Sequence, residues 1–506
     1  MPLETPPRIV HKRPGWKFWI ILGLLGLPAA LVAKPFFYLL RSSQINAAHE
    51  TVTPSGYTDD ASRLNRTRVV EIVHAESDSA AAESQLAELL QRAQREGIKV
   101  SIAGARHTMG GHTIAPDGIQ IDMTTFRGMS LSADSATLHV RGGTRWSEVI
   151  PFLDSAHRSL PVMQSNNSFT AGGSLSANAH GWQHDHAPMA SMVRSMRVMT
   201  TDGVVRRASR DENAELFRLT LGGYGLFGII LDADLQTVPN ELYRVRRYKT
   251  SADDYESTYA RRVTGQRAIG MAYGRLSITA ATFLKEAMLT EFVRDSATTS
   301  PLPPVTTPGL LGVKRAVIRG SENSQYGKTL RWTLEKWLGE LPGSTRFTRN
   351  QLLNESVEFF ANTSDSTTDV LHEYFVPTGR LAAFVRQVRP IITQSRADLI
   401  NVTIRNVLPD SDAFLAYARQ PLWGLVMLFT QERSPTGEAR MRALTRRLID
   451  AALAVGGTYY LPYRLHATRE QFHRAYPMAA QFFALKRKYD PAEILSNTFY
   501  LTYGMP

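Results

Sequence analysis

The 506-residue chain contains no cysteine. Disulfides, thiolate metal ligands, a cysteine nucleophile and a cysteinyl cofactor link are therefore excluded. Its glycine-rich stretches also lack the strict Rossmann spacing and a following Walker lysine. Acidic residues are the minority, 46 against 58 basic ones, and the net charge is +12. Because no long Lys/Arg block or nucleic-acid motif accompanies this excess, we interpret it as a solvated arginine-rich surface and expect no nucleic-acid partner.

One long apolar run occurs, near the N-terminus. Residues 18–33 carry no charge, and residues 35–40 continue the apolar character after Lys34. Together they are long enough for a membrane span of roughly 20 residues. We therefore expect a basic N-terminus at 1–17, a single transmembrane anchor at 18–40 and a linker at 41–60.

The charges that flank this run set its expected orientation. Lys12, Arg13 and Lys17 precede it, and the positive-inside rule places that end in the cytoplasm and the catalytic part in the periplasm. Two alternatives stay open. The run is also compatible with a cleaved signal peptide ending at Ala33, or with an interfacial helix broken at a proline, which leaves the catalytic part cytoplasmic.

The chain after the linker is long enough for two domains. Residues 69–73 read as a strand, 80–96 as a helix ending at Gly97, and 99–103 as a second strand, which together predict a βαβ unit. Further strands are expected at 118–123 and 136–141, a helix at 146–157, and a hairpin formed by 191–200 and 203–208.

A glycine-rich turn opens directly after the second strand of this unit. Residues 101–112 read SIAGARHTMGGH, and their small residues let a ligand lie against the backbone. Free N–H groups in such a turn bind a phosphate, which does not require a histidine. His107 therefore indicates a cofactor with which the protein makes a second contact. Similar small-residue stretches at 170–181 and 221–230 favour a large dinucleotide.

The sequence changes in character at about Pro239, where glycine becomes less frequent. Strands are expected at 371–376, 400–407, 425–430 and 458–461, with helices at 380–393 and 438–455. This pattern predicts an antiparallel sheet with helices, which we interpret as a substrate domain. The chain closes with an apolar segment at 488–500.

Taken together, these motifs resemble the vanillyl-alcohol oxidase family of FAD enzymes, which carry a PCMH-type FAD-binding domain. SIAGARHTMGGH resembles the pyrophosphate loop with its flavin-linked histidine, and AGGSLSANAHGWQHDHAP resembles the second flavin-binding stretch. LGGYGLFGII and YDPAEILSN are similar to the segments that close the domain and return to it. The resemblance covers roughly residues 60–506.

The resemblance implies an α+β fold in which the FAD-binding domain has two subdomains and is followed by an α+β substrate, or cap, domain. On this basis the FAD-binding domain spans 61–240, the cap 241–480, and the returning segment 481–506. It also implies FAD bonded to His107 through the flavin 8α-methyl group. The residues expected to contact the cofactor are Gly104, Ala105, Arg106, His107, Thr108, Gly110, Gly111, Gly172, Gly173, Ser176, Gly181, His186, Gly228, Ile230 and Asn497.

Within the family, the C-terminal half is most similar to alditol, aldonolactone and decaprenylphosphoryl-ribose oxidases, through HEYFVP at 372–377 and residues 456–477. Those relatives place a lysine near Tyr463, where this chain has Arg464. The alditol enzymes also have a histidine where Leu428 stands. Both departures concern the substrate and the mechanism.

Four residues are the candidates for catalysis. Arg405 and Arg464 are expected to bind substrate oxygen or to stabilise the reduced flavin, because a guanidinium stabilises negative charge but does not act as a base. Tyr463, with His466 as an alternative, is expected to take the hydroxyl proton, and Glu373 to act as a base or hydrogen-bond partner. His184 and His186 flank Asp185, but this spacing is a weak metal signal, and we expect no metal.

These inferences predict a flavoprotein that oxidises a CH–OH group of a sugar-like, polyol, lactone or lipid-linked small molecule, by hydride transfer to the flavin. Oxygen or a quinone is the expected electron acceptor. Two alternatives stay open: a dehydrogenase or reductase of the same fold that passes electrons to a quinone or carrier, and a membrane-tethered flavin-binding protein without catalysis.

Overall fold

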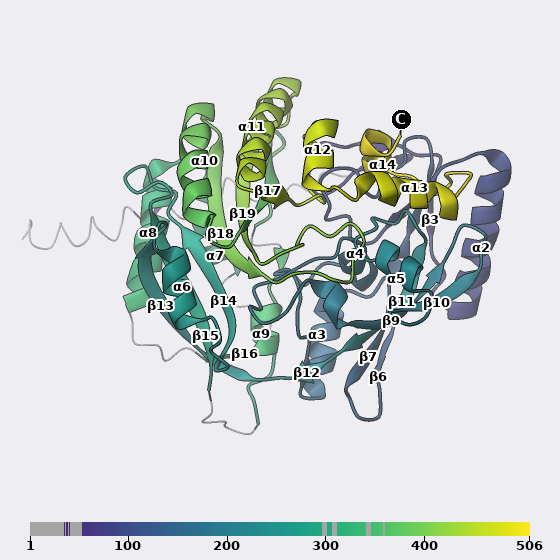
Figure 1. Ribbon diagram of the computed structural model, residues 1–506, viewed down its shortest axis with the longest axis horizontal. Helices are drawn as coiled ribbons and strands as arrows, with labels where there is room; N and C mark the ends of the chain where they lie inside the picture. The colour runs from purple at the N-terminus through teal and green to yellow at the C-terminus, as the bar shows by residue number, and fades with distance from the viewer. Residues whose placement is uncertain are drawn as a thin grey trace, which may run out of the picture.

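The computed structural model describes residues 53–295, 301–305, 311–340, 346–357 and 360–505, together with Pro35, Phe37, Tyr38 and Leu40 (Figure 1). The predicted N-terminal segment at 1–17 and nearly all of the predicted anchor at 18–40 lie outside this part of the chain. Within it, no helix is long and apolar enough to cross a membrane.

A small parallel sheet begins the fold, with the strand order β3-β5-β4. The helix α2 (Ser79–Glu96) connects β3 (Glu71–His74) to β4 (Val100–Ala103), and β5 (Ile119–Asp122) lies between them. Asp78 caps α2 at its start and Gly97, with φ 68°, at its end. The predicted βαβ unit is confirmed, and the glycine-rich turn follows β4 directly.

A five-stranded antiparallel sheet follows, in the order β10-β9-β11-β7-β6. The predicted hairpin is confirmed as β9 and β10. The strands of this sheet are β6 (Met129–Leu131), β7 (Thr137–Arg141), β9 (Val193–Met199), β10 (Val205–Ser209) and β11 (Ile229–Gln236). Three helices accompany them: α3 (Trp146–Ser155), α4 (Ala171–Ser176) and α5 (Ala214–Thr220). Two short pairs complete this part: β1 (Tyr57–Thr58) with β2 (Thr67–Arg68), and β8 (Arg158–Ser159) with β12 (Val238–Pro239).

The second half of the chain forms an eight-stranded antiparallel sheet in the order β16-β13-β15-β14-β18-β19-β17-β20. It contains the strands that the sequence predicts after Pro239. Its strands are β13 (Leu242–Ser251), β14 (Ile269–Leu276), β15 (Glu286–Arg294), β16 (Arg346–Thr348), β17 (Thr367–Pro377), β18 (Asp398–Val407), β19 (Leu422–Glu432) and β20 (Thr458–Tyr459).

Helices pack against this sheet. The helix α11 (Pro435–Ala454) contacts α10 (Leu381–Ser395) as well as β17 and β19 (Figure 1). The other helices of this half are α6 (Tyr255–Arg262), α7 (Leu311–Arg319), α8 (Gln325–Glu340) and α9 (Arg349–Leu353). The mixture of helices and sheets fits the expected α+β class.

The C-terminal segment crosses back to the first half. It contains α12 (Arg469–Ala475), which lies beside α11, and α13 (Ala479–Tyr489) and α14 (Thr498–Tyr503), drawn in yellow towards the purple α2 in Figure 1. Leu495 forms a parallel bridge with Val100 of β4, and the Thr498 amide donates to the Gly111 carbonyl at 3.2 Å. These two contacts hold the C-terminal segment against β4 and against the glycine-rich turn.

Candidate functional site

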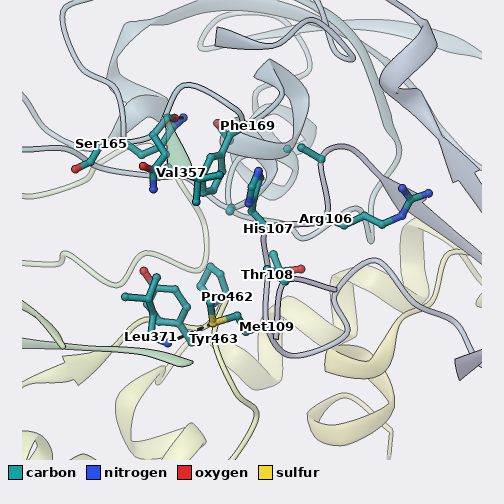
Figure 2. Close-up of a pocket in the computed structure, with 18 of the residues that line it drawn as sticks. Arg106, His107, Thr108, Met109, Ser165, Phe169, Val357, Leu371, Pro462 and Tyr463 are labelled. Atoms are coloured by element: carbon teal, nitrogen blue, oxygen red, sulfur yellow. Dashed lines mark hydrogen bonds between the residues drawn. The ribbon is translucent and has the colours of Figure 1, made fainter. Parts of the chain in front are cut away.

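A cavity of about 450 Å³ lies where the two halves meet. The first half lines it with the turn after β4, with α4 and with the loop before β11. The second half lines it with strands β14, β17, β18 and β19. Figure 2 shows His107 beside Phe169, with Leu371 and Tyr463 across the opening.

Most of the residues predicted to contact the cofactor line this cavity, and they come from all three glycine-rich stretches. The lining members are Gly104, Ala105, Arg106, His107, Thr108, Gly172, Gly173, Ser176, Gly228 and Ile230. The structure brings these stretches together from positions more than 120 residues apart, as a binding site for one large ligand requires.

The other predicted contacts lie elsewhere. Gly110 packs against the Tyr463 carbonyl, where a Cβ atom would lie only 2.5 Å away, and Gly111 adopts φ 69° and donates its N–H to Asp60. Asn497 caps α14. Gly181 is packed against Met163, and His186 pairs with Asp185 at 2.7 Å. These residues therefore shape or surround the site from outside the cavity wall.

Several buried polar atoms of the cavity wall have no hydrogen-bond partner in the described part of the chain. They are Thr108 Oγ1, Thr113 Oγ1, Gln164 Oε1, Asn166 Oδ1 and Trp182 Nε1. A buried polar atom without a partner costs about 1–3 kcal/mol. Their concentration in one cavity, beside glycines that leave the backbone accessible, fits a large polar ligand such as FAD.

His107 is held against the cavity by an aromatic neighbour. Its ring stacks on Phe169 with the centroids 4.1 Å apart and the planes at 16°. Burial, aided by the charge of Arg145, lowers the pKa of His107 to about 4. At neutral pH the imidazole is therefore uncharged and retains a nitrogen lone pair.

Arg106, immediately before His107, adopts the left-handed conformation with φ 54°. Its guanidinium donates to Gln120 Oε1 and Asp122 Oδ2, both at 2.9 Å. Residues with side chains rarely adopt this backbone conformation unless their surroundings impose it. The side-chain contacts of Arg106 thus fix the turn that presents His107.

Glu373 faces the cavity from β17, and its partner is a histidine that the sequence motifs did not single out. His180 Nε2 lies 2.7 Å from Glu373 Oε1, with the two side chains only 4% and 1% exposed. Gly424 on β19 pairs with Phe375 and leaves room for this carboxylate, because a Cβ atom there would lie 3.1 Å from Oε1. His180 belongs to the second glycine-rich stretch, and the available signal was its place in ANAHG.

Tyr463 and Arg405 also line the cavity. The Tyr463 hydroxyl lies 3.5 Å from Glu373 Oε2, and burial raises the pKa of Tyr463 well above its usual value. This hydroxyl is therefore suited to donate a hydrogen bond and not to act as the base. Arg405 Nη2 donates to Ser165 Oγ at 2.8 Å, while its buried Nε has no partner among the described residues.

Arg464 and His466 do not line the cavity. Arg464 contacts Asn65 and Glu438, and His466 Nε2 lies 2.7 Å from Glu438 Oε1. The guanidinium donates a hydrogen bond to the Met109 carbonyl, in the turn that carries His107. The prediction that Arg464 meets substrate or flavin, and that His466 takes a proton there, therefore does not agree with where these side chains lie.

Comparisons with known proteins indicate the same cofactor as the lining of the cavity. A family model described as an FAD binding domain matches residues 79–209, which include α2, the His107 turn and α4. This part of the chain is thus similar to an FAD binding domain.

Relatives of this chain are named as oxidoreductases. An uncharacterized oxidoreductase of a fasciation locus in Rhodococcoides fascians is 30% identical over 164 residues, which is 32% of this chain and 37% of the relative. Cytokinin dehydrogenase 2 of Oryza sativa subsp. japonica is 31% identical over 28% of the chain and 26% of the relative. L-gulonolactone oxidase of Bos taurus is 26% identical over 31% and 35%. The matches therefore span little more than a third of these relatives at most.

Proposed function

We propose that the protein is an FAD-dependent oxidoreductase that oxidises a CH–OH group of a sugar-like, polyol, lactone or lipid-linked substrate. Bound FAD would supply the hydride acceptor at flavin N5. The alcohol carbon loses a hydride and its hydroxyl loses a proton, which yields the carbonyl product. The protein must therefore hold the carbon in place and accept the proton.

The His180–Glu373 pair carries this proposal. It is buried, it faces the cavity, and His180 Nε2 lies 2.7 Å from Glu373 Oε1. General bases within hydrogen-bond reach of a substrate hydroxyl accelerate proton transfer by roughly 100- to 10,000-fold. The Tyr463 hydroxyl lies beside the same carboxylate and would donate to a substrate oxygen.

The lining of the second half supports a hydroxylated substrate. Asn401, Thr403 and Arg405 alternate along β18 and all line the cavity. Thr403 pairs with Val426, which in turn pairs with Glu373 across β19 and β17. Hydrogen-bonding groups thus extend across the sheet from the proton acceptor. The name of the L-gulonolactone oxidase relative favours a sugar lactone among these substrates.

We also propose the covalent link through His107. Attachment replaces one C–H bond of the flavin 8α-methyl group by a C–N bond to the imidazole. The methyl carbon and the imidazole would each lose one proton, and the two electrons left on the flavin would pass to oxygen or a quinone. The uncharged state of His107 supports this, because a protonated imidazole has no free lone pair.

Anaerobic reduction of the flavin with a panel of polyols, aldoses, lactones and prenyl-phosphate sugars tests the activity. We expect bleaching of the flavin absorbance by at least one class. Failure of every class, with FAD bound, contradicts the CH–OH assignment.

Acid precipitation tests the covalent link. We expect the flavin to stay with the wild-type chain and to be released from His107→Ala. Acid-stable flavin in His107→Ala contradicts it.

A second candidate is a dehydrogenase that passes electrons to a quinone. The apolar run at 18–40 favours it, because a tethered enzyme would meet an acceptor dissolved in the bilayer. Stopped-flow reoxidation of the reduced enzyme by oxygen and by a soluble quinone separates the two. Rapid oxygen consumption with hydrogen peroxide release contradicts the quinone version.

A further inference from the structure

The turn that carries His107 is held from behind by a network of buried polar groups. Met109 donates its N–H to the Pro462 carbonyl at 2.8 Å. The Met109 carbonyl accepts from Arg464 Nη1 at 2.9 Å and from Asn65 Nδ2 at 3.0 Å. Both polar backbone groups of Met109 therefore have partners, two residues after His107.

Arg464 is itself fixed by partners on both sides. Its Nη1 also donates to Asn65 Oδ1 at 2.7 Å, and its Nη2 donates to Glu438 Oε1 of α11 at 2.5 Å. The two charged side chains are only 9% and 17% exposed. A buried ion pair of this kind is costly to break, because removal of one partner leaves the other charge unpaired.

Glu438 completes the arrangement from the helix. It accepts from Arg464 and from His466, and these contacts hold its pKa well below the usual range although burial opposes ionisation. His466 Nδ1 in turn lies 2.8 Å from Thr445 Oγ1. The carboxylate is therefore charged at neutral pH, and α11 of the second half is connected through it to the cofactor turn of the first half.

We infer that Arg464 and Glu438 form a positioning pair for His107. The His107 ring stacks on Phe169, and Arg464 holds the same turn by its hydrogen bond to the Met109 carbonyl. Arg464 does not line the cavity, so it acts through the turn and not on a ligand. Its role is to set the position of the imidazole for bonding to the flavin, and in this respect the inference rests on the proposed function.

The decisive experiment uses the full-length variants Arg464→Met, Arg464→Lys and Glu438→Gln. A displacement of about 1 Å at a reacting group lowers rates by roughly 100-fold, so we expect the rate of acid-stable flavin attachment in Arg464→Met to fall by about 10- to 100-fold. We expect the FAD to stay bound non-covalently, and Arg464→Lys to restore part of the rate. Hydrogen exchange at residues 105–111 should become faster.

Arg262→Met is the matched control. It breaks another Arg–Glu pair, with Glu291 at 2.7 Å, and neither residue lines the cavity. It should leave both readouts unchanged. Unaltered attachment and unaltered exchange at 105–111 in Arg464→Met overturn the inference, as does an equal effect of Arg262→Met.

Two further outcomes are also decisive. If Arg464→Met does not fold, Arg464→Lys and Glu438→Gln decide the question by the same two readouts. If the wild-type protein holds no acid-stable flavin, the proposed His107 link fails separately. Hydrogen exchange at 105–111 then supports or overturns the positioning role on its own.

Discussion

The two walls of the cavity present their groups to a ligand in different ways. The first half uses backbone and small residues, gathered from the turn at 104–108, from α4 and from the loop before β11. The second half uses side chains on strands, such as Glu373 on β17 and Arg405 on β18. The first arrangement suits a cofactor held along its length, and we call this side the cofactor wall. The second suits selection of a substrate by its functional groups, and we call it the substrate wall.

The largest effect on the substrate wall is expected from Glu373→Gln. The amide keeps the size of the side chain but cannot accept the hydroxyl proton, so anaerobic flavin reduction should slow by roughly 100- to 10,000-fold. FAD content should not change. Glu432→Gln, at the exposed end of β19, is the control. Normal reduction by Glu373→Gln would remove the carboxylate from the mechanism.

The cofactor wall should respond differently to Gly172→Val. A Cβ atom at this position would lie 3.0 Å from the Gly142 carbonyl, so the added side chain must displace backbone. We expect FAD content after gel filtration to fall by about tenfold, at a stability cost of about 1–3 kcal/mol. Gly265→Asn, where nothing lies within 4 Å of a Cβ atom, is the control. Full FAD content in Gly172→Val would show that this wall is less tightly packed than we infer.

Gly424→Ala tests the substrate wall without removal of a functional group. The new methyl group would lie 3.1 Å from Glu373 Oε1 and from the Phe375 ring, and must push the carboxylate aside. We expect flavin reduction to slow by about tenfold with FAD content unchanged. A variant with the wild-type rate would indicate that the His180–Glu373 geometry tolerates displacement.

The smallest effect on activity is expected from His372→Gln. His372 lies on β17 between two cavity residues but points to α11, where it faces Thr445 at 3.4 Å. Burial, aided by the charges of His466 and Arg464, lowers its pKa to about 3, while Glu438 opposes the shift. The flavin reduction rate should stay near that of the wild type.

The same histidine should instead affect stability at low pH. It is uncharged in the folded state but binds a proton below about pH 6.5 when unfolded, so the wild-type free energy of unfolding falls as the pH drops from 6.5 towards 3. His372→Gln should remove about 1–3 kcal/mol of this loss between pH 7 and pH 4.5 in urea unfolding. Identical pH profiles for the two proteins would contradict this assignment.

Local patterns in the sequence predicted much of the first half. The helix of α2, with Gly97 at its end, and the β9–β10 hairpin depend on neighbouring residues, and the structure confirms both. The glycine-rich turns were also identified from short segments. Such features are predictable because capping, turn geometry and close backbone approach involve residues that are adjacent in the chain.

The substrate wall was less predictable from the sequence, because its contacts join segments that are far apart in the chain. Glu373 was a candidate from the sequence, but its pairing with His180, almost 200 residues away, depends on how β17 meets the second glycine-rich stretch. Arg464 stands next to Tyr463 in the chain, yet only Tyr463 lines the cavity. Which of two adjacent side chains faces a site depends on the local path of the backbone and not on composition.

The sequence by itself determined many of the elements, the three glycine-rich stretches and the candidate status of His107, because these follow from local spacing and residue type. The tertiary structure decided which groups meet. It paired His180 with Glu373 and placed Arg464 against the turn that carries His107. It also set His372 and Glu373 on opposite faces of one strand. The physical reason is that alternation along a strand and the packing of the two halves fix the direction of each side chain, and chemistry at the site depends on that direction.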